Sequence, residues 1–173
     1  AQAFARLGSQ VRVIQSQPQI LPKEDRDVAE YLQALLEEDD IEIHLNTRAV
    51  AARQEDGEAV VTARRDGEEF DVRAEVLLVA AGRQANVNGL GLDRAGVLFT
   101  PKGIGVDARL RTTARHIYAC GDVNGGFQFT HVAGYEGGIA MANAVLRLPV
   151  RADYTRVPWC TYLDPEPASV GDN

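Results

Sequence analysis

Two Asp-Gly dipeptides, Asp56-Gly57 and Asp66-Gly67, constrain the fold more than any other feature of this sequence. An Asp-Gly pair between two β-prone runs is the strongest short-range signal for a hairpin turn. The two pairs separate three such runs. The sequence therefore predicts an antiparallel three-stranded meander, with strands at 49–54, 59–64 and 69–74.

The segments on either side of the meander are typical of an α/β protein. A short β-branched run at 11–14 precedes residues 25–39, whose apolar side chains fall on one face of a helix. An alternating strand follows at 41–45. After the meander, the fully apolar run 76–82 predicts a buried strand. This order of elements predicts an α/β nucleotide-binding unit with an inserted antiparallel layer.

The second half of the chain is richer in glycine. We interpret residues 83–103 as a crossover and expect short strands at 104–106 and 117–120 and a helix over 131–147. The first half of that helix contains three glycines, each costing about 1 kcal/mol relative to alanine: Gly134, Gly137 and Gly138. Close packing on a sheet and close approach of a ligand both explain them, and the sequence leaves both open.

Charge and composition exclude several classes of partner. Eighteen Lys and Arg against 25 Asp and Glu give a net charge of −7, which argues against nucleic acid and anionic membranes. The longest apolar run is too short to cross a bilayer, and no positively charged leader opens the chain, so we expect a cytoplasmic protein. Cys120 and Cys160 are expected to be buried and, with three scattered histidines, predict no metal site.

The segment IYACGD, residues 117–122, is the candidate ligand-binding segment of this sequence. A strand that runs directly into Gly-Asp places a carboxylate at the carboxyl end of a buried strand, where α/β sheets bind ligands. Asp122 can there accept hydrogen bonds from sugar or ribityl hydroxyls. The small residues before it let a cofactor pass close to the backbone.

With Thr112 ahead of it, this stretch resembles the second flavin-binding motif of the FAD-dependent pyridine nucleotide-disulfide oxidoreductases, a Thr followed by Ile-Tyr-Ala-x-Gly-Asp. Three further segments are similar to that family in the same order: VLLVAAGRQANV (76–87), FTHVAGYEG (129–137) and VPWCTYLDPEPASVG (157–171). Their wording looks closest to the mercuric reductase and dihydrolipoamide dehydrogenase branch. The resemblance implies a Rossmann-like FAD/NAD(P)-binding fold with the three-stranded meander inserted.

The resemblance implies FAD as one cofactor. Asp122 would bind the ribityl chain, with Gly121 allowing the approach. A helix start at Thr130, His131 and Val132 would point its positive end at the flavin pyrimidine, where it stabilises the anionic reduced ring.

The second implied cofactor is NAD(P)H. Ala81, Gly82 and Arg83 would lie along it, while Gln15 and Ser16 would meet the adenosine ribose. An acidic residue at that place favours NAD, and arginines favour NADP. Gln15 is neither, so both nucleotides stay open.

The resemblance divides the chain into an incomplete NAD(P)-binding domain (1–84), the C-terminal part of an FAD-binding domain (85–152) and the start of an interface domain (153–173). It implies a homodimeric oxidoreductase that passes hydride from NAD(P)H through FAD to a small-molecule or disulfide substrate, or to a thiolate-bound metal ion. Two alternatives stay open: a non-catalytic nucleotide-binding or assembly fragment, and a flavin reductase whose acceptor is a quinone, ferredoxin or oxygen.

Other parts that the family mechanism needs are not in this sequence. They are the two glycine-rich loops, the redox-active C-x4-C pair and the His-Glu acid/base pair. Residues 1–7 are typical of the last turns of a helix, ending at Gly8. We therefore expect an internal fragment, truncated at both ends, that contains no catalytic residue and is inactive alone.

Overall fold

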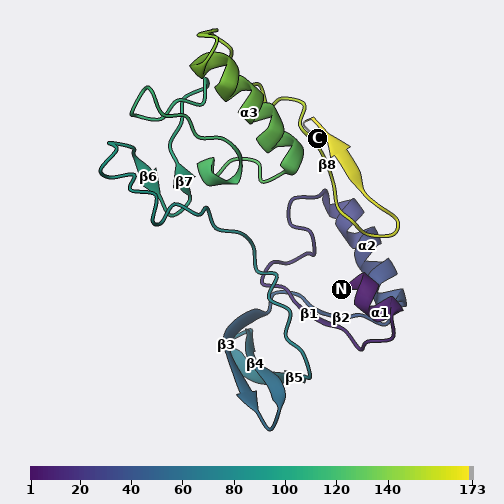
Figure 1. Cartoon of the computed structure of the whole chain (residues 1–173). Coiled ribbons are helices and arrows are strands. Elements are labelled where there is room, and N and C mark those ends of the chain that lie inside the picture. Colours follow the sequence, from purple (N-terminus) through teal and green to yellow (C-terminus); the bar gives the residue numbers. More distant parts are fainter. Residues whose placement is uncertain (172–173) are drawn as a thin grey trace. The chain divides into compact units, whose positions relative to one another are not determined.

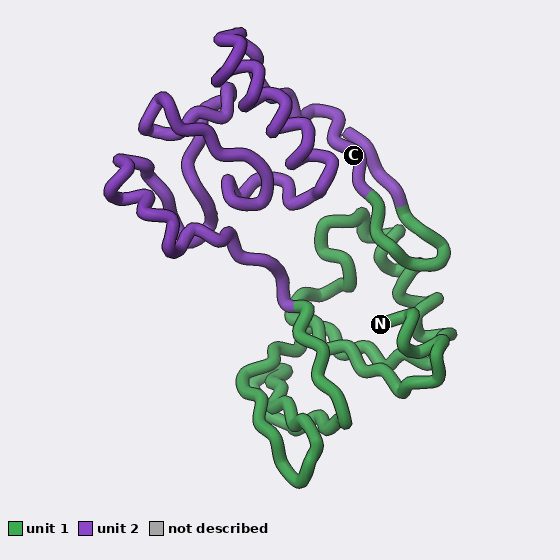
Figure 2. Tube along the Cα trace, in the orientation of Figure 1, with its two compact units in different colours: residues 1–80, 160–167, 173 green, residues 81–159, 168–172 purple. Residues whose placement is uncertain are grey.

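The computed structural model describes residues 1–171, which form two compact units (Figure 2). Unit 1 comprises residues 1–80 and 160–167, and unit 2 comprises residues 81–159 and 168–171. Unit 1 holds α1 (Gln2–Arg6), β1 (Arg12–Ile14), α2 (Arg26–Glu38), β2 (Glu42–His44), β3 (Arg48–Glu55), β4 (Glu58–Arg65) and β5 (Glu68–Ala74) (Figure 1). Unit 2 holds β6 (Phe99–Thr100), β7 (Gly103–Ile104), a 3-10 turn η1 (Gly121–Asn124) and α3 (Thr130–Ala144); near the C-terminus β8 (Pro158–Cys160) pairs with β9 (Ala168–Val170).

A β-α-β arrangement forms the core of unit 1. Strands β1 and β2 pair in parallel, with Val13 opposite Ile43. The predicted helix is present as α2, and its apolar face is buried with residues from the flanking loops: Ile20, Ala29, Leu32, Leu36 and Ile41. The predicted helix end at the start of the chain is also present, since α1 stops at Arg6 and Gly8 has a φ of 95°.

The three-stranded meander is confirmed. Strands β3, β4 and β5 form an antiparallel sheet with β4 in the centre, and Val60 and Ala63 of β4 are fully buried. In both tight turns the Asp and the Gly have positive φ, as at Asp56 (52°) and Gly57 (87°). That backbone is the one required by type I′ hairpins, whose twist matches the flanking strands.

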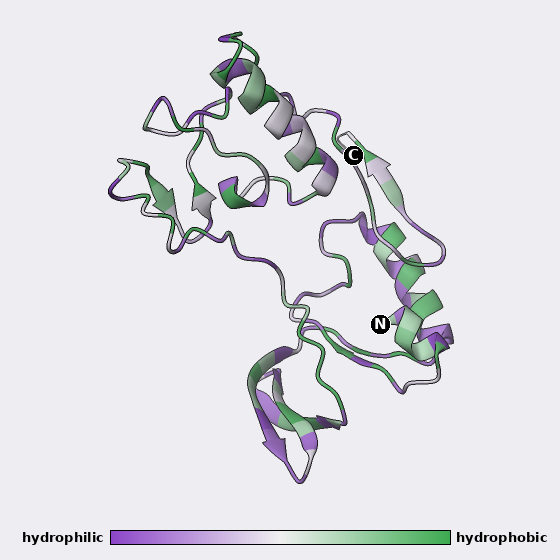
Figure 3. Cartoon of the chain, viewed as in Figure 1, coloured by the Kyte–Doolittle hydropathy of each residue, from purple (hydrophilic) through white to green (hydrophobic). Residues whose placement is uncertain are grey.

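The prediction of a buried strand at 76–82 is wrong. The run is apolar (Figure 3), yet Val76 is 81% exposed and Val79 is 75% exposed, and it belongs to no strand. An extended segment becomes a strand only when a neighbour satisfies its N–H and C=O groups. In the part of the chain that the structure describes, no strand pairs with this segment: β1 pairs with β2, and the meander strands pair with one another.

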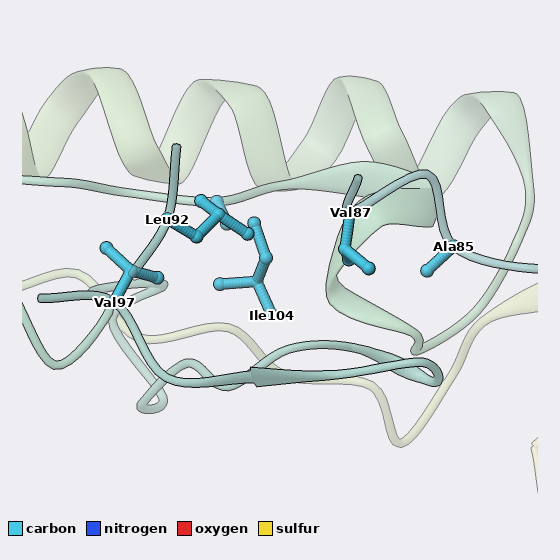
Figure 4. Close-up of a cluster of buried hydrophobic side chains, with 6 residues drawn as sticks. Ala85, Val87, Leu92, Val97 and Ile104 are labelled. Atoms are coloured by element: carbon cyan, nitrogen blue, oxygen red, sulfur yellow. The ribbon is translucent and has the colours of Figure 1, made fainter. Parts of the chain in front are cut away.

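The core of unit 2 is a cluster of aliphatic side chains from loops and from β7 (Figure 4): Ala85, Val87, Leu92, Val97, Ile104 and Ala119. Of the strand expected at 104–106, only Ile104 lies in a strand, β7. The strand expected at 117–120 is reduced to one bridge between Arg111 and Tyr118. The chain there folds back locally, because Thr112 N–H donates to the Ile117 carbonyl (2.9 Å) and Ala119 N–H donates to the Leu110 carbonyl (3.1 Å).

Helix α3 is shorter than expected: it ends at Ala144 and not at residue 147. Asn143, in the last turn of α3, binds the segment that follows the helix. Its side-chain nitrogen donates to the Val150 carbonyl (2.9 Å), and its side-chain oxygen accepts from Val150 N–H (2.9 Å). The same nitrogen donates to the Arg109 carbonyl (3.1 Å). These bonds fix the segment that follows α3 against the helix.

Candidate functional site

A glycine allows the turn that carries Asp122 to pack closely against α3. Cys120 is extended (φ −142°, ψ 154°), and Gly121 then turns the chain with a φ of 75° into η1. Glycine adopts this left-handed backbone without a steric penalty. A Cβ on Gly121 would also lie 3.0 Å from the Cβ of Ala133 in α3. Gly121 therefore allows both the turn and its close approach to the helix.

The other end of η1 lies against β7, backbone to backbone. A Cβ on Gly103 would come within 2.6 Å of the Asn124 carbonyl carbon and of the Gly125 nitrogen. A Cβ on Gly125 would overlap the carbonyl oxygen of Lys102. The turn is thus packed between β7 and α3.

A buried carboxyl group, Glu136 of α3, binds the same turn. Glu136 is only 1% exposed. Its Oε2 accepts hydrogen bonds from Gly121 N–H (2.6 Å) and Asn124 Nδ2 (2.8 Å). Oε1 accepts one from the Tyr154 hydroxyl (2.6 Å). Burial, and then this hydrogen bond, raise the pKa of the Tyr154 phenol above its ordinary value. Glu136 was not predicted as a site residue from the sequence; its spacing from Val132 and Ile139, which places all three on one helix face, was the available signal.

Asp122 is exposed, and within residues 1–171 its carboxylate makes no hydrogen bond or ion pair. The start of α3, against which η1 packs, is also open to a ligand. Its N-cap residue, Phe129, makes no capping hydrogen bond, and within residues 1–171 no side chain bonds to the first N–H groups of the helix. A free carboxylate beside an uncapped helix start suits a ligand that offers hydroxyl donors and polar acceptors.

The predicted residues at the start of α3 have different environments. Thr130 and His131 are exposed, and the imidazole of His131 stacks on the Phe129 ring (centroids 5.4 Å apart, planes 11° apart). The side chain of Val132 is 2% exposed and belongs to the core. The ligand-binding role predicted for Val132 finds no support in this exposure, because the whole residue is buried.

The residues expected along NAD(P)H are divided between the units. In unit 2, Ala81 and Gly82 are exposed, and Arg83 Nη1 donates to the Gln128 carbonyl (2.9 Å), just before α3. In unit 1, Gln15 and Ser16 follow β1. The Gln15 backbone bonds to His44 and Thr47 (both 2.9 Å), which fixes the end of β1 beside β2. The nucleotide-binding role of all five residues remains a prediction.

Both cysteines are exposed, so the expectation that they are buried is wrong. Ala119, two residues before Gly121, is part of the core. Cys120, which lies between them in the sequence, is outside the core. Over residues 1–171 no group of three or more His, Cys, Asp or Glu side chains is placed to hold a metal ion. Within the same range no helix has the length and apolarity that a membrane span requires.

The β-α-β core, the inserted meander and the Gly121–Asp122 turn beside α3 define a dinucleotide-binding α/β protein. Residues 1–137 match the model of the family described as pyridine nucleotide-disulphide oxidoreductase, and the chain belongs to this family. Its members are flavoprotein oxidoreductases that use FAD and NAD(P)H. The Rossmann-like fold class expected from the sequence is therefore correct.

Individual relatives agree with this assignment. The chain is 43% identical over 169 residues to a dihydrolipoyl dehydrogenase of Bacillus subtilis and 40% identical over 171 residues to that of Haloferax volcanii, covering 97% of this chain and 36% of each relative. Among solved structures it is similar to LpdA of Mycobacterium tuberculosis (TM-score 0.89, 32% identity, 99% of this chain and 37% of that one). It is also similar to the HOCl-induced flavoprotein disulfide reductase RclA of Escherichia coli (TM-score 0.87, 29% identity, 99% and 39%). The chain thus spans little more than a third of the length of these relatives.

Proposed function

We propose that this chain forms part of a dihydrolipoyl dehydrogenase-type enzyme, which passes hydride from NAD(P)H through FAD to a disulfide. The observation that carries the proposal is the free Asp122 carboxylate, presented by a packed turn beside the uncapped start of α3. The identity to dihydrolipoyl dehydrogenases along nearly the whole chain supports the disulfide as acceptor.

The residues of this site fit FAD. The Asp122 carboxylate would accept hydrogen bonds from ribityl hydroxyls, and the exposed N–H groups at the start of α3, with the helix dipole, would favour negative charge on the flavin pyrimidine. FAD, when bound, supplies a two-electron carrier. In the overall reaction NAD(P)H gives up a hydride and becomes NAD(P)⁺, and that hydride together with one proton from solvent converts one disulfide into two thiols.

The nucleotide and the assembly complete the proposal. Ala81, Gly82 and Arg83 would lie along NAD(P)H, and the Arg83 bond to Gln128 ties their segment to the approach to α3. The proposal includes a homodimer in the cytoplasm. Residues 157–171, which resemble the start of the family's interface domain and contain the strand pair β8–β9, support the homodimer.

The test uses the protein expressed from its complete gene and loaded with FAD. Under anaerobic conditions, NADH and NADPH are added separately and loss of the oxidised-flavin absorbance is followed. Lipoamide, mercuric ion and a quinone are then offered as acceptors. We expect bleaching by one of the nucleotides and reoxidation by lipoamide. No bleaching by either, or turnover with the quinone or mercuric ion and none with lipoamide, would overturn the proposal.

A further inference from the structure

We infer that Glu136 and Tyr154 are positioning residues that fix the Gly121–Asp122 turn in the geometry that binds flavin. The inference rests on the proposed function, because it concerns the same turn. It adds two residues that touch no cofactor and act through the backbone of Gly121.

The placement of Glu136 favours this role. A carboxyl group out of contact with water is costly unless hydrogen bonds replace its hydration, and here every donor comes from outside α3. Two donors, Gly121 N–H and Asn124 Nδ2, belong to η1, and both meet Oε2. The buried group therefore bonds to the residue directly before Asp122.

Tyr154 fixes the orientation of the Glu136 carboxyl group. Its hydroxyl is bonded to Oε1, which leaves Oε2 directed at the turn. The Tyr154 ring itself packs against two others, with its centroid 5.8 Å from that of Phe127 and 6.4 Å from that of Tyr135. Since the carboxyl group is held at both oxygens, rotation about its side chain would break at least one bond. The Gly121–Asp122 turn, which is bonded to Oε2, is therefore restrained as well.

Glycine is the reason that the turn needs such a contact. Gly121 has a wider range of backbone conformations than any other residue type, and Asp122 follows it directly. A hydrogen bond to the Gly121 amide removes part of that freedom. Binding groups lose affinity when they are displaced by even an ångström, so a released turn would hold FAD less tightly.

Three variants separate positioning from general stability. Tyr154→Phe keeps the ring and removes only the hydroxyl. Glu136→Gln retains one oxygen for the two donors of the turn, and its amide can donate to the Tyr154 oxygen, so the network can persist. Tyr135→Phe is the matched control: its hydroxyl accepts Asp153 N–H (2.9 Å), in the same segment after α3, and its side chain makes no hydrogen bond to η1.

The experiment uses protein from the complete gene, stripped of FAD, and measures FAD affinity by titration, the visible spectrum of the bound flavin and unfolding in urea. For Tyr154→Phe we expect FAD to bind about three- to tenfold more weakly, as loss of one hydrogen bond implies, with a shifted flavin spectrum. Glu136→Ala should weaken binding further, whereas Glu136→Gln and Tyr135→Phe should bind FAD like the unaltered protein.

Normal FAD affinity and spectrum in both Tyr154→Phe and Glu136→Ala would overturn the inference, as would an equal loss in Tyr135→Phe and Tyr154→Phe. If Glu136→Ala fails to fold, the FAD affinity and flavin spectrum of Tyr154→Phe still test the inference. Asp122→Ala distinguishes this inference from the proposed function. If that variant loses FAD while Glu136→Ala and Tyr154→Phe keep it, only the inference fails; if Asp122→Ala also keeps FAD, the flavin site itself is misplaced.

Discussion

The backbone nitrogen of Gly121 lies 2.6 Å from Oε2 of Glu136, a carboxyl oxygen of the helix that packs against the Asp122 turn. On the opposite side of that turn, Gly103 and Gly125 allow β7 to approach backbone to backbone. The backbone of the turn that carries Asp122 is therefore held by contacts with both α3 and β7. The proposed flavin site would therefore depend on the backbone of the turn as well as on the Asp122 carboxylate.

Gly121→Ala should destabilise the protein. The left-handed backbone costs a residue with a Cβ about 1–2 kcal/mol, and the new methyl would press on Ala133 at 3.0 Å. Denaturant unfolding measures the loss. Gly105→Ala is the control, since its Cβ would have only one ordinary contact, 3.7 Å from the Leu98 oxygen. Equal stability of the two variants would contradict the packing described here.

Gly134→Ala should raise the free energy of unfolding by about 0.5–1 kcal/mol, because alanine is the better helix former. A Cβ at Gly134, Gly137 or Gly138 would meet no described atom within 4 Å, so close packing against residues 1–171 does not explain these glycines. Thermal unfolding of the variant is the measurement. A loss of stability would show that another part of the protein covers this face of α3.

Tyr154 should ionise at a higher pH than a tyrosine with an ordinary pKa, as followed by tyrosinate absorbance. Its raised folded-state pKa means that the stabilisation from its neutral phenol is complete below the unfolded value of about 10 and is lost as pH rises through the folded value. Glu136→Gln should lower this pKa only in part, since burial is the larger cause. If Tyr154→Phe leaves the late-titrating component in place, the assignment is wrong.

Asp71 on β5 should make the meander sensitive to acid. The Arg53 guanidinium (2.6 Å) and then the Thr62 hydroxyl (2.8 Å) hold the pKa of Asp71 below its ordinary value. Its contribution to stability is therefore present above the ordinary aspartate pKa and disappears as pH falls through the lowered one. The midpoint temperature of thermal unfolding should fall less steeply with decreasing pH in Asp71→Asn than in the unaltered protein. Identical slopes for variant and unaltered protein would refute this.

Local signals in the sequence predicted local structure well. The turns at Asp56-Gly57 and Asp66-Gly67 are determined by their own backbone preferences, and α2 by the spacing of Ala29, Leu32 and Leu36. The run 76–82 could not be judged this way, because its strand character depends on a hydrogen-bonding neighbour that hydropathy does not reveal.

The candidate site was predictable only in part. Asp122 and the start of α3 were proposed as site residues from the resemblance of their motifs to a family, and their role stays a prediction. Glu136 was missed because a charged residue in a helix is expected to face water, and only its register with Val132 and Ile139 indicates burial. Cys120 was expected inside because thiols are commonly buried, but the neighbouring Ala119 occupies the core.

The most direct test of the flavin site is the FAD dissociation constant of Asp122→Ala, compared with Asp93→Ala and with the unaltered protein from the complete gene. Asp93 is the matched control, because it is exposed in the same unit and its carboxylate makes no ion pair or hydrogen bond within residues 1–171. We expect Asp122→Ala to bind FAD about 10- to 100-fold more weakly, as loss of a charged hydrogen-bond acceptor implies, with unchanged unfolding of the apoprotein. Asp93→Ala should bind FAD normally. Undiminished FAD affinity in Asp122→Ala would contradict the account.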